Sequence, residues 1–467
     1  MRTSAPTTDL SATELLAAYR ARTLSPVEAT EAVLAHIAAW EPHLNATYRL
    51  DADAALAVAR ASEARWQRDE PIGPLDGVPT MIKENIATRG TPMPLGTGST
   101  LLTPAAEDAP PAARLREAGA VILGKTTMPD YGMLTSGVSS FHGTTRNPWN
   151  LAANPGGSSS GAGAGVAAGY GPLHIGTDIG GSVRLPASWC GIFALKPSLG
   201  RIPIDPPYAG RCAGPMTRTV ADAALMMNVL AHPDWRDAMS LPPQAISWQH
   251  LGRDPKGLKI GLWLDGGWGL ALEPEVRAAI EAAARAFEAA GAHIEPLAPF
   301  TTREMIQGLD DFWRTRCWVD IAALPAERRA KVLPYIVTWA EAARGMSAER
   351  LFKGYSAMGA MRDATVRATQ PFDFVLAPVA PMAACGAELP GPANDPARPF
   401  EHIAFTVPAN MSEQPAASVN CGYTESGLPI GLQIIGRRHD DLGVLQLARA
   451  WEEMRPAQRP WPAQPPN

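Results

Sequence analysis

Two glycine–serine stretches stand in the middle of the chain: Asn154-Pro-Gly-Gly-Ser158-Ser-Ser-Gly161 and Thr177-Asp-Ile-Gly-Gly-Ser182-Val-Arg184. They belong to a region, residues 147–197, that is rich in small residues, and a flexible linker can have that composition. Apolar residues are interleaved here, however, as in Val166-Ala-Ala168 and Ile192-Phe193. This interleaving predicts a tightly packed core in which backbone segments approach one another closely.

Helices and strands alternate on both sides of this core. Upstream, residues 76–83 read as a turn that enters a short buried strand and ends at Lys83-Glu84-Asn85. Further segments are predicted by the same patterns, namely a helix and strand at 111–118 and 120–123, strands at 258–263, 374–378 and 429–435, and helices at 274–290 and 440–454. The fold class that follows is α/β: a single large domain with a central mixed, twisted β-sheet covered by helices on both faces.

The chain ends differ from this core. Ser11-Ala-Thr-Glu14 and Ser25-Pro-Val-Glu28 both match the capping box that starts a helix, and residues 53–67 form a third helical pattern. We therefore expect residues 1–70 to be a helical segment packed on an α/β core of residues 71–455. The core includes a variable helical lobe around 300–370, and a proline-rich tail occupies residues 456–467.

Composition restricts the kinds of partner. A net charge of −5 provides no basic field for nucleic acid, and no apolar run reaches the length of a membrane helix. The polar start Met1–Leu10 lacks the apolar core of a signal peptide, and five scattered cysteines fit reduced thiols. We expect a cytoplasmic protein that acts on a small molecule and forms a homodimer, with neither nucleic acid nor membrane as a partner.

Two motifs suggest nucleotide binding but do not fit it. Gly119-Ala-Val-Ile-Leu-Gly-Lys125-Thr126 matches the phosphate-loop pattern, yet its middle residues form the apolar run of a buried strand. Gly163-Ala-Gly165-Val-Ala-Ala168 does not follow a predicted strand, so tight packing explains it better. The nine histidines are dispersed and form no metal-binding pattern. We expect no cofactor and no metal.

The glycine pairs before Ser158 and Ser182 point to chemistry, although Gly-Gly-Ser is also a common turn. Without side chains, consecutive backbone N–H groups can converge on one point and hold an oxyanion. A serine directly after such a nest is placed to attack a carbonyl carbon. Ser182 also stands at the start of a short helical stretch, where the helix dipole favours negative charge.

A nucleophilic serine needs a proton acceptor, and the usual serine–histidine motif is absent around Ser182. Lysine can serve if burial lowers its pKa from about 10.4 towards neutrality. Only seven of the 41 basic residues are lysines, so arginine supplies most fixed positive charge. Lys83, at the end of a buried strand, fits a base, while Lys125 and Lys196 remain competitors on this evidence.

Eight ordered blocks resemble the amidase-signature family of serine–serine–lysine amide hydrolases. They are residues 77–85, 124–128, 146–149, 156–159, 176–187, 191–198, 405–408 and 427–434, and the resemblance runs from about residue 10 to 455. It implies that Ser182 is the nucleophile and that Lys83 is the base. It also implies that Ser158, on a cis peptide after Gly157, bridges the two. Ser160 stands where the family often has glycine.

The resemblance implies further roles around this triad. Backbone N–H groups of Ile179, Gly180, Gly181 and Ser182 would form the oxyanion hole. The remaining implied residues support that loop or face the substrate, and they are Ser159, Thr177, Asp178 and Arg184 for support and Met133, Leu134 and Thr135 for the substrate.

The implied activity is hydrolysis of carboxylic amide C–N bonds through an acyl-serine intermediate. The alternative within the family is the glutaminase subunit of a tRNA-dependent amidotransferase complex. The stretch Phe312–Trp339, with Met358 and Met361, favours a small apolar or aryl amide over glutamine, although plain core explains such a stretch equally well. A binding protein on an inactive amidase fold is disfavoured, because all three triad positions are intact.

Overall fold

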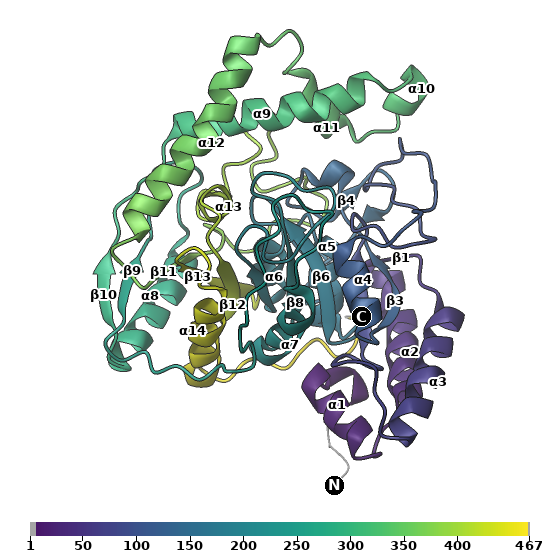
Figure 1. Cartoon of the computed structure of the whole chain (residues 1–467). Helices are drawn as coiled ribbons and strands as arrows, with labels where there is room; N and C mark the ends of the chain where they lie inside the picture. The colour runs from purple at the N-terminus through teal and green to yellow at the C-terminus, as the bar shows by residue number, and fades with distance from the viewer. Residues whose placement is uncertain (1–5, 466–467) are drawn as a thin grey trace.

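A mixed sheet of eleven strands runs through the middle of the computed structural model, which describes residues 6–465 (Figure 1). Its strand order is β1-β3-β2-β6-β8-β7-β12-β13-β11-β9-β10, and a separate hairpin pairs β4 with β5. The strands are β1 Thr47–Tyr48, β2 Pro79–Lys83, β3 Val121–Thr126, β4 Val138–Ser139, β5 Gly143–Thr144, β6 Leu173–Asp178, β7 Phe193–Lys196, β8 Cys212–Thr217, β9 Lys259–Leu262, β10 His293–Pro296, β11 Phe374–Pro378, β12 Ala416–Tyr423 and β13 Pro429–Gly436.

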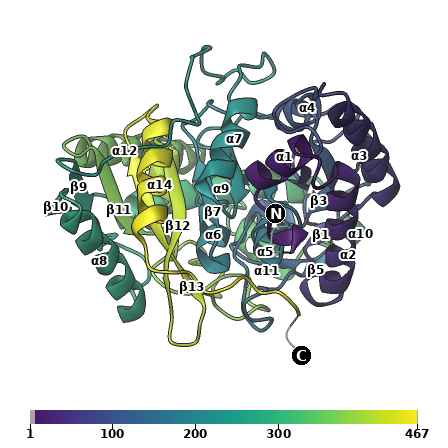
Figure 2. The ribbon, with the colours of Figure 1, turned by 90° about the horizontal axis from the view of Figure 1, so that it is seen from below.

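Helices cover both faces of this sheet, as the sequence predicts (Figures 1 and 2). They are α1 Ala12–Arg20, α2 Pro26–Leu44, α3 Ala52–Gln67, α4 Pro110–Glu117, α5 Ser160–Ala168, α6 Arg184–Cys190, α7 Val220–Leu230, α8 Pro274–Ala289, α9 Arg303–Ala322, α10 Ala326–Arg329, α11 Pro334–Glu341, α12 Ala348–Thr369, α13 Val407–Met411 and α14 Asp441–Met454, with short 3-10 helices η1 Thr7–Asp9 and η2 Asp130–Gly132. The predicted strands and helices all occur, although their ends are displaced by a few residues.

Successive side chains along each strand point to opposite faces of the sheet, so each strand contributes to two separate cores. Ile82 and Ile434 belong to the core under α1, α4, α7, α8 and α14. Their neighbours in sequence point the other way: Met81 joins the core under α2, α3 and α5, and Ile435 joins the core of the helical lobe. The central strands are buried on both sides, which is why they read as continuous apolar runs.

The glycine- and serine-rich region is part of the core. Every residue of α5 and α6 is buried, and α5 packs against α6 and the strands beside it. A Cβ atom at Gly161 would lie 2.2 Å from the carbonyl oxygen of Ala46, so glycine is needed where these backbones meet. The prediction of a close-packed core is confirmed, and the linker alternative is excluded.

Residues near both ends of the described chain pack on the body. Both predicted capping boxes are present, with Ser11 and Ser25 each receiving the backbone N–H of the glutamate three residues on. After α14 the tail crosses the lower side of the molecule (Figure 2). There the ring of Trp461 lies 5.9 Å from that of Trp149, beneath the guanidinium of Arg218.

The helical lobe of α9 to α12 lies above the sheet in Figure 1. Its aromatic and sulfur-containing residues are mostly core: Trp313, Trp339, Met358 and Met361 are buried together with residues of α13 and β11. Among residues 6–465, no helix combines the length and the apolar character that crossing a membrane requires.

Candidate active site

Lys83 ends strand β2 with its side chain fully buried. Its Nζ donates hydrogen bonds to the hydroxyl oxygens of Ser158 at 2.8 Å, Ser159 at 3.0 Å and Thr177 at 3.0 Å. The Thr177 carbonyl oxygen lies 3.5 Å away. Parallel pairing of β2 with β6 brings Thr177 to the same edge of the sheet as Lys83. The amine is therefore surrounded by hydroxyl groups, and no carboxylate of residues 6–465 is in direct contact with it.

This environment favours the neutral amine. Burial and the positive charge of Arg211 lower the pKa of Lys83 well below 10.5, against the weaker opposing effect of Asp178 and Glu84. An amine that is neutral near pH 7 can accept a proton from a neighbouring hydroxyl. The structure thus places a buried amine with a lowered pKa in contact with Ser158.

The two competing lysines lie elsewhere. The register pairs Lys125 with Ile82, the residue before Lys83, so Lys125 points to the opposite face of the sheet. Burial lowers the pKa of Lys125 to about 7, but its Nζ donates to the Ile86 carbonyl and, at 2.7 Å, to the Thr88 hydroxyl. Lys196 donates to the carbonyl oxygen of Pro197 at 2.8 Å. Neither lysine contacts Ser158 or Ser182.

Ser158 is placed by the turn that precedes α5. The peptide bond between Gly157 and Ser158 is cis, as the family resemblance implies. Glycine is required just before it, because a Cβ at Gly157 would lie 2.5 Å from the backbone nitrogen of Ser136. The next residue, Ser159, links the turn to the second serine loop, because its N–H donates to the Ser182 carbonyl at 3.2 Å.

The loop that carries Ser182 is held from within by Asp178. One carboxylate oxygen accepts the N–H of Gly181 at 2.8 Å, and the other accepts the N–H of Val183 at 3.1 Å. Gly181 has a φ of +127°, where a side chain would collide with Leu185. The Gly181 amide therefore holds the loop instead of facing the cavity, which differs from the role expected for it.

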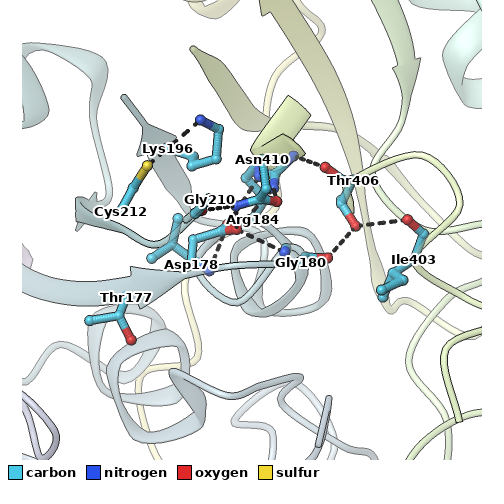
Figure 3. Close-up of polar contacts among 12 residues, drawn as sticks. Thr177, Asp178, Gly180, Arg184, Lys196, Gly210, Cys212, Ile403, Thr406 and Asn410 are labelled. Atoms are coloured by element: carbon cyan, nitrogen blue, oxygen red, sulfur yellow. Dashed lines mark hydrogen bonds and ion pairs between the residues drawn. The ribbon is translucent and has the colours of Figure 1, made fainter. Parts of the chain in front are cut away.

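Arg184 locks the same loop to the C-terminal third of the chain (Figure 3). Its guanidinium forms a fully buried ion pair with Asp178 at 2.9 Å. Its remaining donors reach residues far along the chain: the Thr406 carbonyl at 2.9 Å, the Gln433 side chain at 2.7 Å and the Asn410 side chain at 2.6 Å. The Thr406 hydroxyl donates to the Gly180 carbonyl at 2.6 Å.

Electrostatics explain why this network stays charged. Burial alone would raise the pKa of the Asp178 carboxyl, but the charge of Arg184 and hydrogen bonds from Arg184 and Asn410 hold it well below its usual range. A buried carboxylate with this many donors stays ionised at neutral pH. The loop before Ser182 is thus fixed by a permanent ion pair.

Three amides of the loop remain available. The N–H groups of Ile179, Gly180 and Ser182 donate to no acceptor within the described residues 6–465. Ile179 and Ser182 line the cavity beside Ser158, and a Cβ at Gly180 would lie 3.2 Å from the Trp313 ring. The free amides of Ile179 and Ser182 thus belong to residues that line the cavity.

A cavity of about 410 Å³ opens onto Ser158 and Ser182. Its walls include residues expected from the sequence, namely Met133, Thr177, Asp178 and Ile179. Within the described chain, Leu134 and Thr135 are buried and do not line it, so substrate contact by these two stays a prediction. From the stretch Phe312–Trp339, the lining residues are Arg316, Cys317 and Asp320, while the buried tryptophans belong to the core.

Several residues of the site were not recognised from the sequence. Asn85 donates to the Thr177 hydroxyl at 3.1 Å, and Tyr131 and Arg211 line the cavity. Thr406, Asn410 and Gln433 complete the Arg184 network. A signal existed for Gln433, which is a lone polar side chain within the apolar strand β13. In residues 6–465 no cluster of histidine, cysteine or acidic side chains has an arrangement that could hold a metal ion.

Comparison with known proteins gives a consistent result. The family model described as Amidase matches residues 28–445. The chain is 34% identical to an acylamidase of Rhodococcus erythropolis, over 96% of both proteins. It is also 34% identical to a glutamyl-tRNA(Gln) amidotransferase subunit of Myxococcus xanthus (strain DK1622), over 95% of this chain and 97% of that one. A crystal structure of a bacterial aryl acylamidase superposes with a TM-score of 0.90 at 31% identity, covering 99% of this chain and 100% of the other.

Proposed function

The chain belongs to the amidase-signature family of amide C–N hydrolases, and we propose that it cleaves small apolar or aryl amides through an acyl-enzyme intermediate on Ser182. The observation that carries the proposal is the contact between the fully buried Lys83 amine and the Ser158 hydroxyl, 2.8 Å apart beside a cavity that also contains Ser182.

The proposed mechanism begins with neutral Lys83 taking a proton from Ser158, which takes one from Ser182. The Ser182 oxygen then bonds to the amide carbonyl carbon, and the amides of Ile179 and Ser182 hold the oxyanion. The proton returns through the same relay to the leaving nitrogen as the C–N bond breaks. Water deacylates the enzyme by the reverse relay, so Lys83 alternates between base and acid.

The lining of the cavity supports an apolar substrate. Met93, Leu95, Met128 and Met133 contribute flexible apolar side chains to its wall. Tyr131 adds a ring whose hydroxyl is bonded to Ser99 at 3.0 Å. An acyl chain or an aromatic ring fits such a wall, and the similarity to an acylamidase and an aryl acylamidase agrees with it.

The alternative is a glutaminase that works as one component of an amidotransferase complex. What supports it is the 34% identity to the amidotransferase component of Myxococcus xanthus over nearly the full length of both chains. The two functions differ in substrate and in the need for partner proteins. An isolated chain that hydrolyses aryl amides quickly and releases no ammonia from glutamine supports the amidase.

The test uses the purified chain on a panel of 4-nitroanilides, read by absorbance, and on glutamine, read by ammonia release. A fluorophosphonate should label Ser182, as peptide mapping by mass spectrometry would show. Ser160→Ala is the matched control, because the hydroxyl of this buried serine bonds the Thr127 carbonyl at 3.4 Å and contacts no residue of the triad. Labelling of another serine, or labelling that survives Ser182→Ala, would refute the assignment of the nucleophile.

A further inference from the structure

Arg211 stands directly beside the loop of the proposed nucleophile. Strands β6 and β8 are antiparallel, and their last paired residues at this end are Asp178 and Cys212. The next residues out, Ile179 and Arg211, therefore leave the sheet side by side and both line the cavity. Asn410 fixes this backbone, because it donates to the Gly210 carbonyl at 3.0 Å as well as to Asp178 (Figure 3).

The guanidinium of Arg211 is not neutralised by the protein. The side chain is half-buried, and its one hydrogen bond within residues 6–465 goes to the Pro206 carbonyl at 2.7 Å. No carboxylate of that described range forms an ion pair with it, although Asp205 and Asp237 attract it through space. Burial and the nearby Arg316 lower its pKa to about 10, so it remains a cation at neutral pH.

Arg316 brings a second guanidinium to the same wall. It projects from α9, lies 4.8 Å from the centre of the Tyr208 ring, and donates to the Met133 sulfur at 3.6 Å. Its side chain is exposed, so its charge is screened more than that of Arg211. The cavity thus has one half-buried cation with free donors, Arg211, and one exposed cation, Arg316.

We propose that Arg211, assisted by Arg316, binds a carboxylate of the substrate, so that the preferred substrates are amides that carry a carboxylate group. The inference rests on the proposed amide hydrolysis and narrows its substrate class. The planar guanidinium presents paired N–H donors that match the two oxygens of a carboxylate. The apolar wall would contact the hydrocarbon part of the same molecule.

The other charged residues of the cavity favour a ligand group with one negative charge over a group with two. Asp205 and Asp320 also line the cavity, and both are exposed at its mouth. They would repel a dianion such as a phosphate monoester more strongly than a carboxylate, which carries a single negative charge. A carboxylate is therefore the anion that suits this arrangement.

Two substrate pairs of matched shape test the proposal. On the acyl side, succinic acid mono-4-nitroanilide is compared with 4-methylpentanoic acid 4-nitroanilide, in which isopropyl replaces the carboxylate. On the amine side, 4-acetamidobenzoate is compared with 4-isopropylacetanilide. A hydrogen-bonded charge should raise kcat/KM for the charged member of one pair by about tenfold to hundredfold. Equal kcat/KM in both pairs would overturn the proposal without any variant.

Variants then locate the effect. Arg211→Gln should bring the ratio of charged to neutral substrate close to one, and Arg316→Gln should lower it less, because that side chain is exposed. Arg211→Lys keeps the charge but loses the paired donors, so it should retain part of the preference. Arg285→Gln, an exposed change on α8, is the control. A preference that survives Arg211→Gln would overturn the assignment.

A binding measurement separates this inference from the hydrolysis itself. N-phenylsuccinamate is titrated into Ser182→Ala and into Ser182→Ala/Arg211→Gln by calorimetry. Binding to the first and not to the second supports the carboxylate site, even if none of the amides is turned over and the proposed hydrolysis fails. Equal binding to both proteins refutes the site, even if the amides are turned over.

Discussion

Replacing Asp178 with asparagine tests whether the buried ion pair holds the Ser182 loop. The carboxylate accepts hydrogen bonds from Gly181, Val183, Arg184 and Asn410, at 2.8 to 3.1 Å. Asparagine keeps a similar shape but turns one acceptor into a donor that faces other donors. It also leaves the Arg184 charge buried without a partner, which typically costs about 3–5 kcal/mol.

This cost can be converted into a melting temperature. Unfolding entropy is about 2.1 cal/mol/K per residue, so a chain of 467 residues has roughly 1 kcal/mol/K. The Tm of Asp178→Asn should therefore fall by about 3–5 °C. The rate should fall more steeply: loss of a single oxyanion donor costs about 10²- to 10³-fold in kcat, and loosening the loop displaces the amides of Ile179 and Ser182.

The assay combines thermal unfolding followed by circular dichroism with kcat on a 4-nitroanilide well below the Tm. Asp441→Asn is the matched control. Asp441 is equally buried, pairs with Arg201 at 3.0 Å and accepts the Ser198 N–H, but it lies outside the cavity. It should lower the Tm by a similar amount and preserve kcat. An Asp178→Asn enzyme with wild-type kcat, or an equal loss of kcat in Asp441→Asn, would refute the reasoning.

Three further predictions concern the proposed relay. Ser182→Ala should reduce kcat by about 10⁴- to 10⁶-fold, as for other nucleophilic serines, and turnover within about tenfold of wild type in the same 4-nitroanilide assay would exclude this residue. Lys83→Arg should be nearly as damaging as Lys83→Ala, because a guanidinium keeps its proton, whereas Lys125→Arg should retain more activity; an active Lys83→Arg enzyme contradicts a proton relay. In wild type, kcat/KM should rise with pH through the Lys83 pKa, which lies well below 10.5. Arg211→Gln should move this limb to higher pH, because it removes a positive charge that lowers the Lys83 pKa, and an unmoved limb would show that another group titrates.

The helices and strands whose formation depends on neighbouring residues could be predicted from sequence. Capping boxes and apolar runs depend on neighbouring residues, so α1, α2, β2 and β3 were found from their own patterns. The choice among Lys83, Lys125 and Lys196 was left open by the residues alone, since all three lie at or near the end of a buried strand. Strand register determines which of the three lysines contacts Ser158, and register is a property of the assembled sheet.

Long-range polar partners could not be predicted in the same way. Arg184 is visible as a charge in a small-residue segment, but its partners Thr406, Asn410 and Gln433 lie more than 200 residues later. Arg211 was missed because an arginine beside a strand is normally a solvated charge. Its significance comes from its place in the cavity wall without an ion-pair partner among residues 6–465, which only the packed structure reveals.

The reach of Arg184 has a consequence for synthesis of the protein. Lys83, Ser158 and Ser182 are all translated before residue 200, yet the network that holds the Ser182 loop requires side chains as far along as Gln433. A nascent chain that carries the complete triad still lacks the partners of Arg184. We therefore expect hydrolytic competence only near the end of translation, once α13 and β13 have been synthesised and have packed around that guanidinium.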